Sequence, residues 1–141
     1  MTRVLALILL ITATLSGMPA GASDLGEALE MMRSEKWDQA AREAGRRQSV
    51  SHDIIEWHRL RAGLGSARDV TAFLERRPDW PGLAYLRRRN EAVIAGAGHK
   101  AVLNFYEKER PQTAEGALSL GKALIAAGRR GDGEAEIVLA W

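Results

Sequence analysis

The chain has 141 residues, which is enough for one ordinary domain, and it contains no cysteine. A domain without disulfides must be held together by packing alone. The formal net charge of +2 is too small to indicate a nucleic-acid partner.

The first 22 residues have the pattern of a secretory signal peptide. Arg3 gives a short positive region, residues 4–15 are almost entirely apolar, and Ala20, Gly21 and Ala22 form an A-x-A cleavage site. We therefore expect export, cleavage near Ala22 and a mature chain of residues 23–141. The apolar run is shorter than the ~20 residues of a spanning helix, so no stable membrane span is expected after cleavage.

Apolar residues recur at helical spacing in the first half of the mature chain, and no segment alternates over a strand length. The polar residues 34–36 separate the first two predicted helices, which are expected to be antiparallel neighbours. Gly63 and Gly65 end the third helix, Ser66 and Asp69 cap the fourth, and Pro78 closes it. The predicted inward faces are Leu25, Ala28, Leu29 and Met32; Trp37, Ala40, Ala41 and Ala44; Ile54, Trp57, Leu60 and Leu64; and Val70, Phe73 and Leu74.

The second half continues in the same way. Pro81 suits the first turn of a fifth helix, residues 99–109 form the sixth, and Thr113 caps the seventh. Three glycines supply the turn before a last helix: Gly128, Gly131 and Gly133. The predicted inward faces are Leu83, Leu86, Val93 and Ile94; Val102, Phe105 and Tyr106; Ala117, Leu120 and Leu124; and Ala135, Val138 and Leu139.

Helices of about ten to fifteen residues with short Gly or Pro connections are typical of αα-repeat proteins. We predict an all-α fold, an irregular αα-hairpin superhelix that is a TPR-like solenoid. It is irregular because no fixed period of about 34 residues connects its units. The last apolar stripe reaches Trp141 without a stop signal, so we expect the superhelix to be truncated inside a unit.

Residue patterns typical of catalysis or metal binding are missing. The three histidines, His52, His58 and His99, lack the spacing of metal ligands, so we expect neither a metal nor another cofactor. The carboxylate pairs, Glu27 with Glu30 and Glu107 with Glu109, are expected on solvated faces. No Gly-x-Ser-x-Gly elbow or phosphate loop occurs, so no catalytic residue is predicted.

Four basic runs and the tryptophans are the remaining candidates for binding. The pairs at residues 46–47, 76–77 and 129–130 fall near predicted helix C-termini, where cations are favoured. Arg87, Arg88 and Arg89 cover about 200° of a helix surface, so at least one guanidinium faces away from the core. These three are the candidate substrate-binding residues, suited to an anionic polymer.

Tryptophan side chains have two possible roles here. Trp37, Trp57 and Trp80 fit a helix stripe or a Trp-Pro corner, so core packing is the expected role. Stacking on sugar rings is the alternative.

Several segments in this order resemble the N-terminal part of soluble lytic murein transglycosylases of the Slt type. The resemblance covers most of the mature chain. It is carried by residues 53–57 (DIIEW), 73–81 (FLERRPDWP), 86–91 (LRRRNE), 105–106 (FY), 111–116 (PQTAEG) and 139–141 (LAW).

The resemblance implies a periplasmic protein in which a long α-superhelix precedes a lysozyme-like domain. In that family the second domain cleaves the bond from N-acetylmuramic acid to N-acetylglucosamine and leaves a 1,6-anhydromuramyl end, with a glutamate in a Glu-Ser motif. No Glu-Ser pair occurs in this chain, so no catalytic residue can be carried over and the catalytic domain is expected to be absent.

Two functions therefore remain open. The chain can be the N-terminal scaffold fragment of a periplasmic lytic transglycosylase, with peptidoglycan glycan strands as the partner of the parent protein and cell-wall proteins as further partners. Alternatively, it is a stand-alone exported TPR-like module that binds protein and has no catalytic activity.

Overall fold

A computed structural model describes residues 20–140, and the side chains from residue 24 onward. These described residues form nine α-helices and no strand, so the all-α prediction is confirmed. Residues 1–19 of the predicted signal peptide and Trp141 lie outside them. The helices are α1 (Ala20–Arg33), α2 (Trp37–Glu43), α3 (Val50–Arg61), α4 (Ala67–Arg76), α5 (Leu83–Arg89), α6 (Glu91–Ala95), α7 (His99–Phe105), α8 (Ala114–Ala126) and α9 (Arg130–Leu139).

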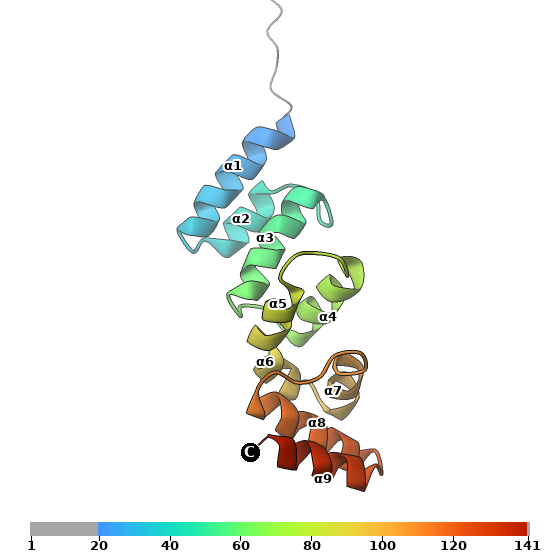
Figure 1. Cartoon of the computed structure of the whole chain (residues 1–141). Helices are drawn as coiled ribbons and strands as arrows, with labels where there is room; N and C mark the ends of the chain where they lie inside the picture. The colour runs from blue at the N-terminus through green and yellow to red at the C-terminus, as the bar shows by residue number, and fades with distance from the viewer. Residues whose placement is uncertain (1–19, 141) are drawn as a thin grey trace, which may run out of the picture.

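The helices are stacked in chain order from α1 at one end of the molecule to α9 at the other (Figure 1). All the substantial packing contacts join helices that are at most two positions apart in that order. This local pattern is solenoid-like, and it makes each helix dependent on its immediate neighbours. None of the described helices is long and apolar enough to cross a membrane.

Two apolar clusters hold the stack together. The small one joins α1, α2 and α3 through Ala28, Ala40, Ala44 and Ile55, where the alanines let helices approach closely. The larger one extends from α3 to α8 and contains Leu60, Val70, Phe73, Leu86, Ile94, Val102, Phe105, Tyr106 and Ala123. Helix α3 contributes to both clusters, so it links the two ends of the molecule.

Two predicted helix caps are present. The Ser66 hydroxyl accepts from the Asp69 backbone N–H at 3.2 Å, and the Asp69 carboxylate accepts from the Ser66 N–H at 3.1 Å. Thr113 Oγ1 accepts from the Gly116 N–H at 3.0 Å at the start of α8. Both caps satisfy backbone donors that have no partner inside the helix.

The predicted continuous helix over residues 83–94 is wrong, because it breaks at Asn90. The buried Asn90 amide donates to the carbonyl oxygens of Leu60 and Leu86, both at 2.8 Å. Its backbone leaves the helical region at φ −113° and ψ 6°. The long-range bond to α3 therefore redirects the chain between α5 and α6. Pro81 also lies outside the helix, which begins after Gly82.

Three further boundaries differ from the prediction. Leu64 follows the end of α3 and is 51% exposed, so it does not belong to the apolar face. Helix α7 ends at Phe105, four residues early, because the next segment is bonded to Glu91 of α6. Gly131 and Gly133 lie inside α9, and of the three glycines only Gly128 has a positive φ.

Helices α8 and α9 form the predicted αα-hairpin, and two glycines set their separation. A Cβ atom at Gly121 would lie 2.5 Å from Ile137 Cγ1 and 2.8 Å from the Gly133 carbonyl oxygen. The backbones therefore cross at a distance that a larger side chain cannot occupy.

We expect Gly121→Ala to lower the free energy of unfolding by about 1–3 kcal/mol, because the added methyl group overpacks this crossing. Gly131→Ala is the control: it lies in α9 with open space around it, and it should raise stability by up to about 1 kcal/mol. Urea unfolding followed by circular dichroism measures both, and equal effects would contradict the close crossing.

Candidate functional site

The three candidate arginines form the last turn of α5 and do not share one surface. Arg87 donates to the Phe105 carbonyl oxygen, and its guanidinium lies 4.3 Å from the centre of the Phe105 ring. Burial lowers the pKa of Arg87. Arg88 and Arg89 are exposed, and Arg89 also donates to the Ala62 carbonyl oxygen at 3.5 Å, so Arg88 is the arginine of the three with no internal bond to the described residues.

Arg76 and Arg77, at the end of α4, surround a buried carboxylate that the sequence did not single out. Asp53 of α3 is fully buried. Its two oxygens accept from Arg76 Nη2 at 2.9 Å and from Arg77 Nε at 2.7 Å. Arg76 also pairs with Glu56 at 2.5 Å. This arginine pair is therefore an internal link between α3 and α4, in addition to its favourable place at a helix C-terminus.

His52, Asp53 and Glu56 bring their possible ligand atoms within 4.8 Å of one another. Metal ions prefer such groups when they are free to donate electron pairs. Here both carboxylates already bind arginines, and a cation would lie beside two guanidinium charges. The arrangement therefore suits arginine binding and disfavours a metal.

Glu91 is the second fully buried carboxylate, and it fastens the segment before α8 onto α6. It accepts from the backbone N–H groups of Gln112 at 2.7 Å and Thr113 at 2.9 Å, and from Thr113 Oγ1 at 2.5 Å. Gly116 packs against the Glu91 carboxylate, because a Cβ atom at this position would lie only 2.8 Å from Glu91 Cδ. Like Asp53, Glu91 is committed to internal partners, which leaves it unsuited to proton transfer with a substrate.

The predicted solvated carboxylates are exposed on the surface. This holds for Glu27, Glu30, Glu107 and Glu109, as expected. None of them lies in a dry pocket of the kind that a general acid needs.

The core-packing prediction holds for two of the tryptophans. Trp57 and Trp80 pack against the larger apolar cluster, with ring centres 6.4 Å apart. The Trp57 indole N–H donates to the Pro81 carbonyl oxygen at 3.0 Å. Trp37 is different, because it packs against neither cluster and its indole N–H has no partner among the described residues.

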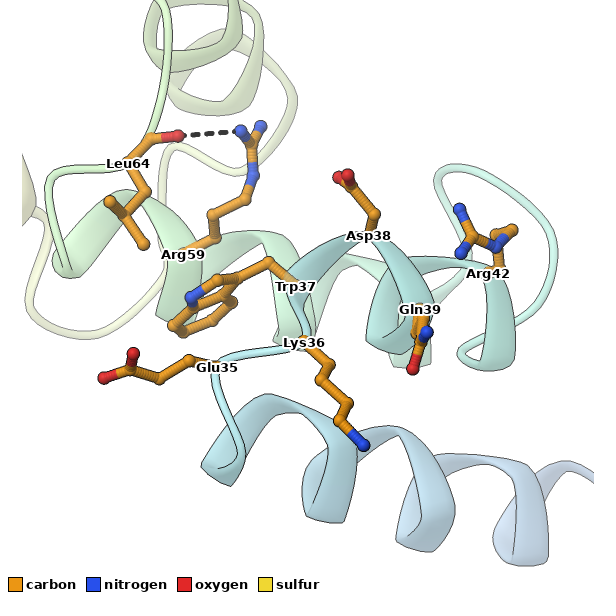
Figure 2. Close-up of a pocket in the computed structure, with 8 residues that line it drawn as sticks. All are labelled: Glu35, Lys36, Trp37, Asp38, Gln39, Arg42, Arg59 and Leu64. Carbon is orange, nitrogen blue, oxygen red and sulfur yellow. Dashed lines mark hydrogen bonds between the residues drawn. The ribbon is translucent and has the colours of Figure 1, made fainter.

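Trp37 lines a surface pocket of about 530 Å³ at the start of α2. Figure 2 shows the indole with Glu35 on one side and with Arg59 and Leu64 on the other. The other lining residues are Lys36, Asp38, Gln39 and Arg42. A partly buried aromatic ring with polar side chains around it is a typical binding arrangement, and the volume fits a small ligand.

Most of the polar groups in this pocket are free. Arg59 donates to the Leu64 carbonyl oxygen at 2.9 Å and to Asp69 at 3.1 Å. The other polar side chains of the lining have no hydrogen bond or ion pair with the described residues: Glu35, Lys36, Asp38, Gln39 and Arg42. They are available to a ligand without breaking an internal contact.

Comparison with protein-family models, with curated proteins and with solved structures gives no significant match. The assignment of a function therefore rests on the residues and contacts of this chain.

Asp53→Asn should lower the free energy of unfolding by about 3 kcal/mol, because two guanidinium groups lose the charge that compensates their partial burial. The control is Asp132→Asn, which removes an exposed pair with Arg129 and should cost less than about 1 kcal/mol. Chemical unfolding of both variants is the measurement. A small effect at Asp53 would show that the pair does not hold α3 and α4 together.

Tyr106 should make the protein sensitive to alkali. Burial raises the pKa of its hydroxyl, and the Glu91 charge adds to the shift. Above the ordinary pKa of 10.0 the unfolded chain ionises while the folded one stays neutral, so stability falls by up to about 1.4 kcal/mol per pH unit. Tyr106→Phe should remove this part of the slope. Tyr85→Phe, at an exposed position, is the control, and equal slopes in both variants would contradict the assignment.

Proposed function

We propose that this chain is a non-catalytic scaffold segment of a periplasmic lytic transglycosylase of the Slt type, and that it binds peptidoglycan glycan strands. The proposal joins the resemblance in sequence to a solenoid-like all-α fold. Cleavage to 1,6-anhydromuramyl ends is assigned to the parent family, whose catalytic motif this chain does not contain.

One observation carries the proposal: the segments that resemble the family contact one another. Segment 53–57 meets segment 73–81 through the Asp53 ion pairs with Arg76 and Arg77. Trp57 of the first segment also bonds to the Pro81 carbonyl oxygen of the second. These polar contacts give the quoted residues a structural role in holding adjacent helices together.

The later segments are linked in the same manner. Glu91, at the end of segment 86–91, binds the backbone of Gln112 and Thr113 in segment 111–116. Arg87 of the same segment covers Phe105 of segment 105–106. Several of the quoted residues therefore hold neighbouring helices together, which is consistent with a role in a helical scaffold.

The buried carboxylates support a non-catalytic role. General acid catalysis on a glycan needs a carboxyl group that can reach the bond to be broken. Asp53 and Glu91 are enclosed by internal donors instead. Neither of these two carboxylates can therefore serve as the general acid.

The first test is pelleting of the purified protein with sacculi that have been stripped of protein. We expect saturable binding and no release of anhydromuropeptides above a buffer control, as measured by chromatography of the supernatant. Release of these products would refute the non-catalytic role. Lack of binding to stripped sacculi would refute the glycan-binding function.

The exposed arginines give this assay a specific variant. Arg88→Ala with Arg89→Ala removes two exposed charges without disturbing the Arg87 contact with Phe105, and a thermal melt controls for the lost bond from Arg89 to the Ala62 carbonyl oxygen. If these arginines help to bind the polymer, retention on sacculi should fall several-fold at low salt and less at high salt. Unchanged retention would remove them from the binding surface.

Protein binding is the second candidate function, and helix α9 favours it. Val138 and Leu139 are 71% and 70% exposed, which is unusual for two adjacent large apolar residues. Stripped sacculi separate the two candidates, because a module that binds only protein would not pellet with them.

A further inference from the structure

The Trp37 pocket combines an available aromatic ring with free polar groups of several kinds. The ring N–H has no internal partner, and the same holds for the amide, the two carboxylates and two of the cationic groups that line the pocket. The side chains come from the turn before α2 and from the exposed side of that helix (Figure 2). Nothing in the packing of the two apolar clusters requires a tryptophan at this position.

Glu35 lies at the edge of this pocket, in the turn that ends α1. Its backbone has a φ of +59°, in the left-handed region that glycine adopts most easily. Backbone bonds from Glu35 and Lys36 to the end of α1 fix this turn, at 2.9 Å each. This is the usual way in which a helix ends, and it holds the Glu35 side chain at the rim of the pocket while glycine would fit the same backbone with less strain.

The chemistry of the lining indicates the kind of ligand. A pyranose ring has an apolar face of C–H groups that fits an indole, and hydroxyl and acetamido groups at its edge that bond to carboxylates, amides and cations. An apolar peptide would leave these polar side chains unpaired. A neutral ring with many hydrogen-bonding groups uses the whole lining.

We infer that the Trp37 pocket is a sugar-binding subsite that takes one N-acetylated pyranose ring of a glycan strand. The inference rests on the proposed function and names the place where the strand is held. Trp37 supplies the stacking surface, and the Glu35 carboxylate and the Gln39 amide bind groups at the edge of the ring.

The experiment uses the purified full chain and a soluble probe, the tetramer of β-1,4-linked N-acetylglucosamine. Proton–nitrogen NMR spectra follow the indole N–H signals, and the Trp37→Phe spectrum assigns the Trp37 signal. We expect the tetramer to shift the Trp37 signal and to leave those of Trp57 and Trp80 in place. Binding curves for the tetramer and for stripped sacculi then give the affinities.

Two pairs of variants separate binding from folding. Trp37→Ala should weaken binding about tenfold, and Tyr85→Ala, at another exposed aromatic residue, should not change it. Glu35→Gly should weaken binding about threefold while keeping or raising the melting temperature, because glycine accepts the turn. Gln48→Gly is its matched control, since Gln48 also has a positive φ of 66° and lies outside the pocket.

The outcomes distinguish this inference from the proposed function. If the wild-type protein binds sacculi but the Trp37 and Glu35 variants bind equally well and the indole signal does not move, the subsite is wrong and the scaffold function stands. If the wild-type protein binds neither sacculi nor the tetramer, both are wrong. A Trp37 shift with the stem peptide L-Ala-D-Glu, and none with the tetramer, would also overturn the sugar assignment.

Discussion

The buried Asp53 carboxylate is the constraint on which the rest of this structure depends. A buried charge is tolerated only when opposite charges and hydrogen bonds surround it, so α4 must place Arg76 and Arg77 against α3. That contact sets the position of α4, and with it the ring of Phe73 against Trp80 in the larger apolar cluster. Since α3 also reaches into the smaller cluster, these ion pairs fix α4 against the helix that links the two clusters.

Buried polar side chains also connect helices further along the chain. Asn90 and Glu91 are adjacent, buried and polar, and both bond to segments that lie 20 or more residues away. Asn90 separates α5 from α6, and Glu91 fixes the segment that leads into α8. Short helices that bury little apolar area each can thus be held in a defined order by a few specific polar bonds. In a scaffold, such joints determine the shape that is presented to a ligand.

The tryptophans show how position in the stack separates structural from binding roles. Trp57 and Trp80 are enclosed between α3, α4 and the turn before α5, and their rings pack edge to face. Trp37 is at the outside of the α1–α2 turn, where the small alanine-rich cluster has no space for it. The ring is therefore available at the surface, next to polar groups that no other part of the described chain uses. These features are the basis of the sugar-binding subsite that we propose at the α1–α2 turn.

The sequence by itself determined the helical class, most of the helix faces, the caps at Ser66 and Thr113 and the hairpin at the end, because these follow from local spacing and local hydrogen bonds. The tertiary structure alone decided the break at Asn90, the early end of α7 and the pairing of Asp53 with two arginines. These depend on partners 20 to 30 residues away, which a local pattern cannot reveal. It also decided that Trp37 is free while Trp57 and Trp80 are packed, since all three fit a helix stripe or corner equally well and only the neighbours of each ring differ.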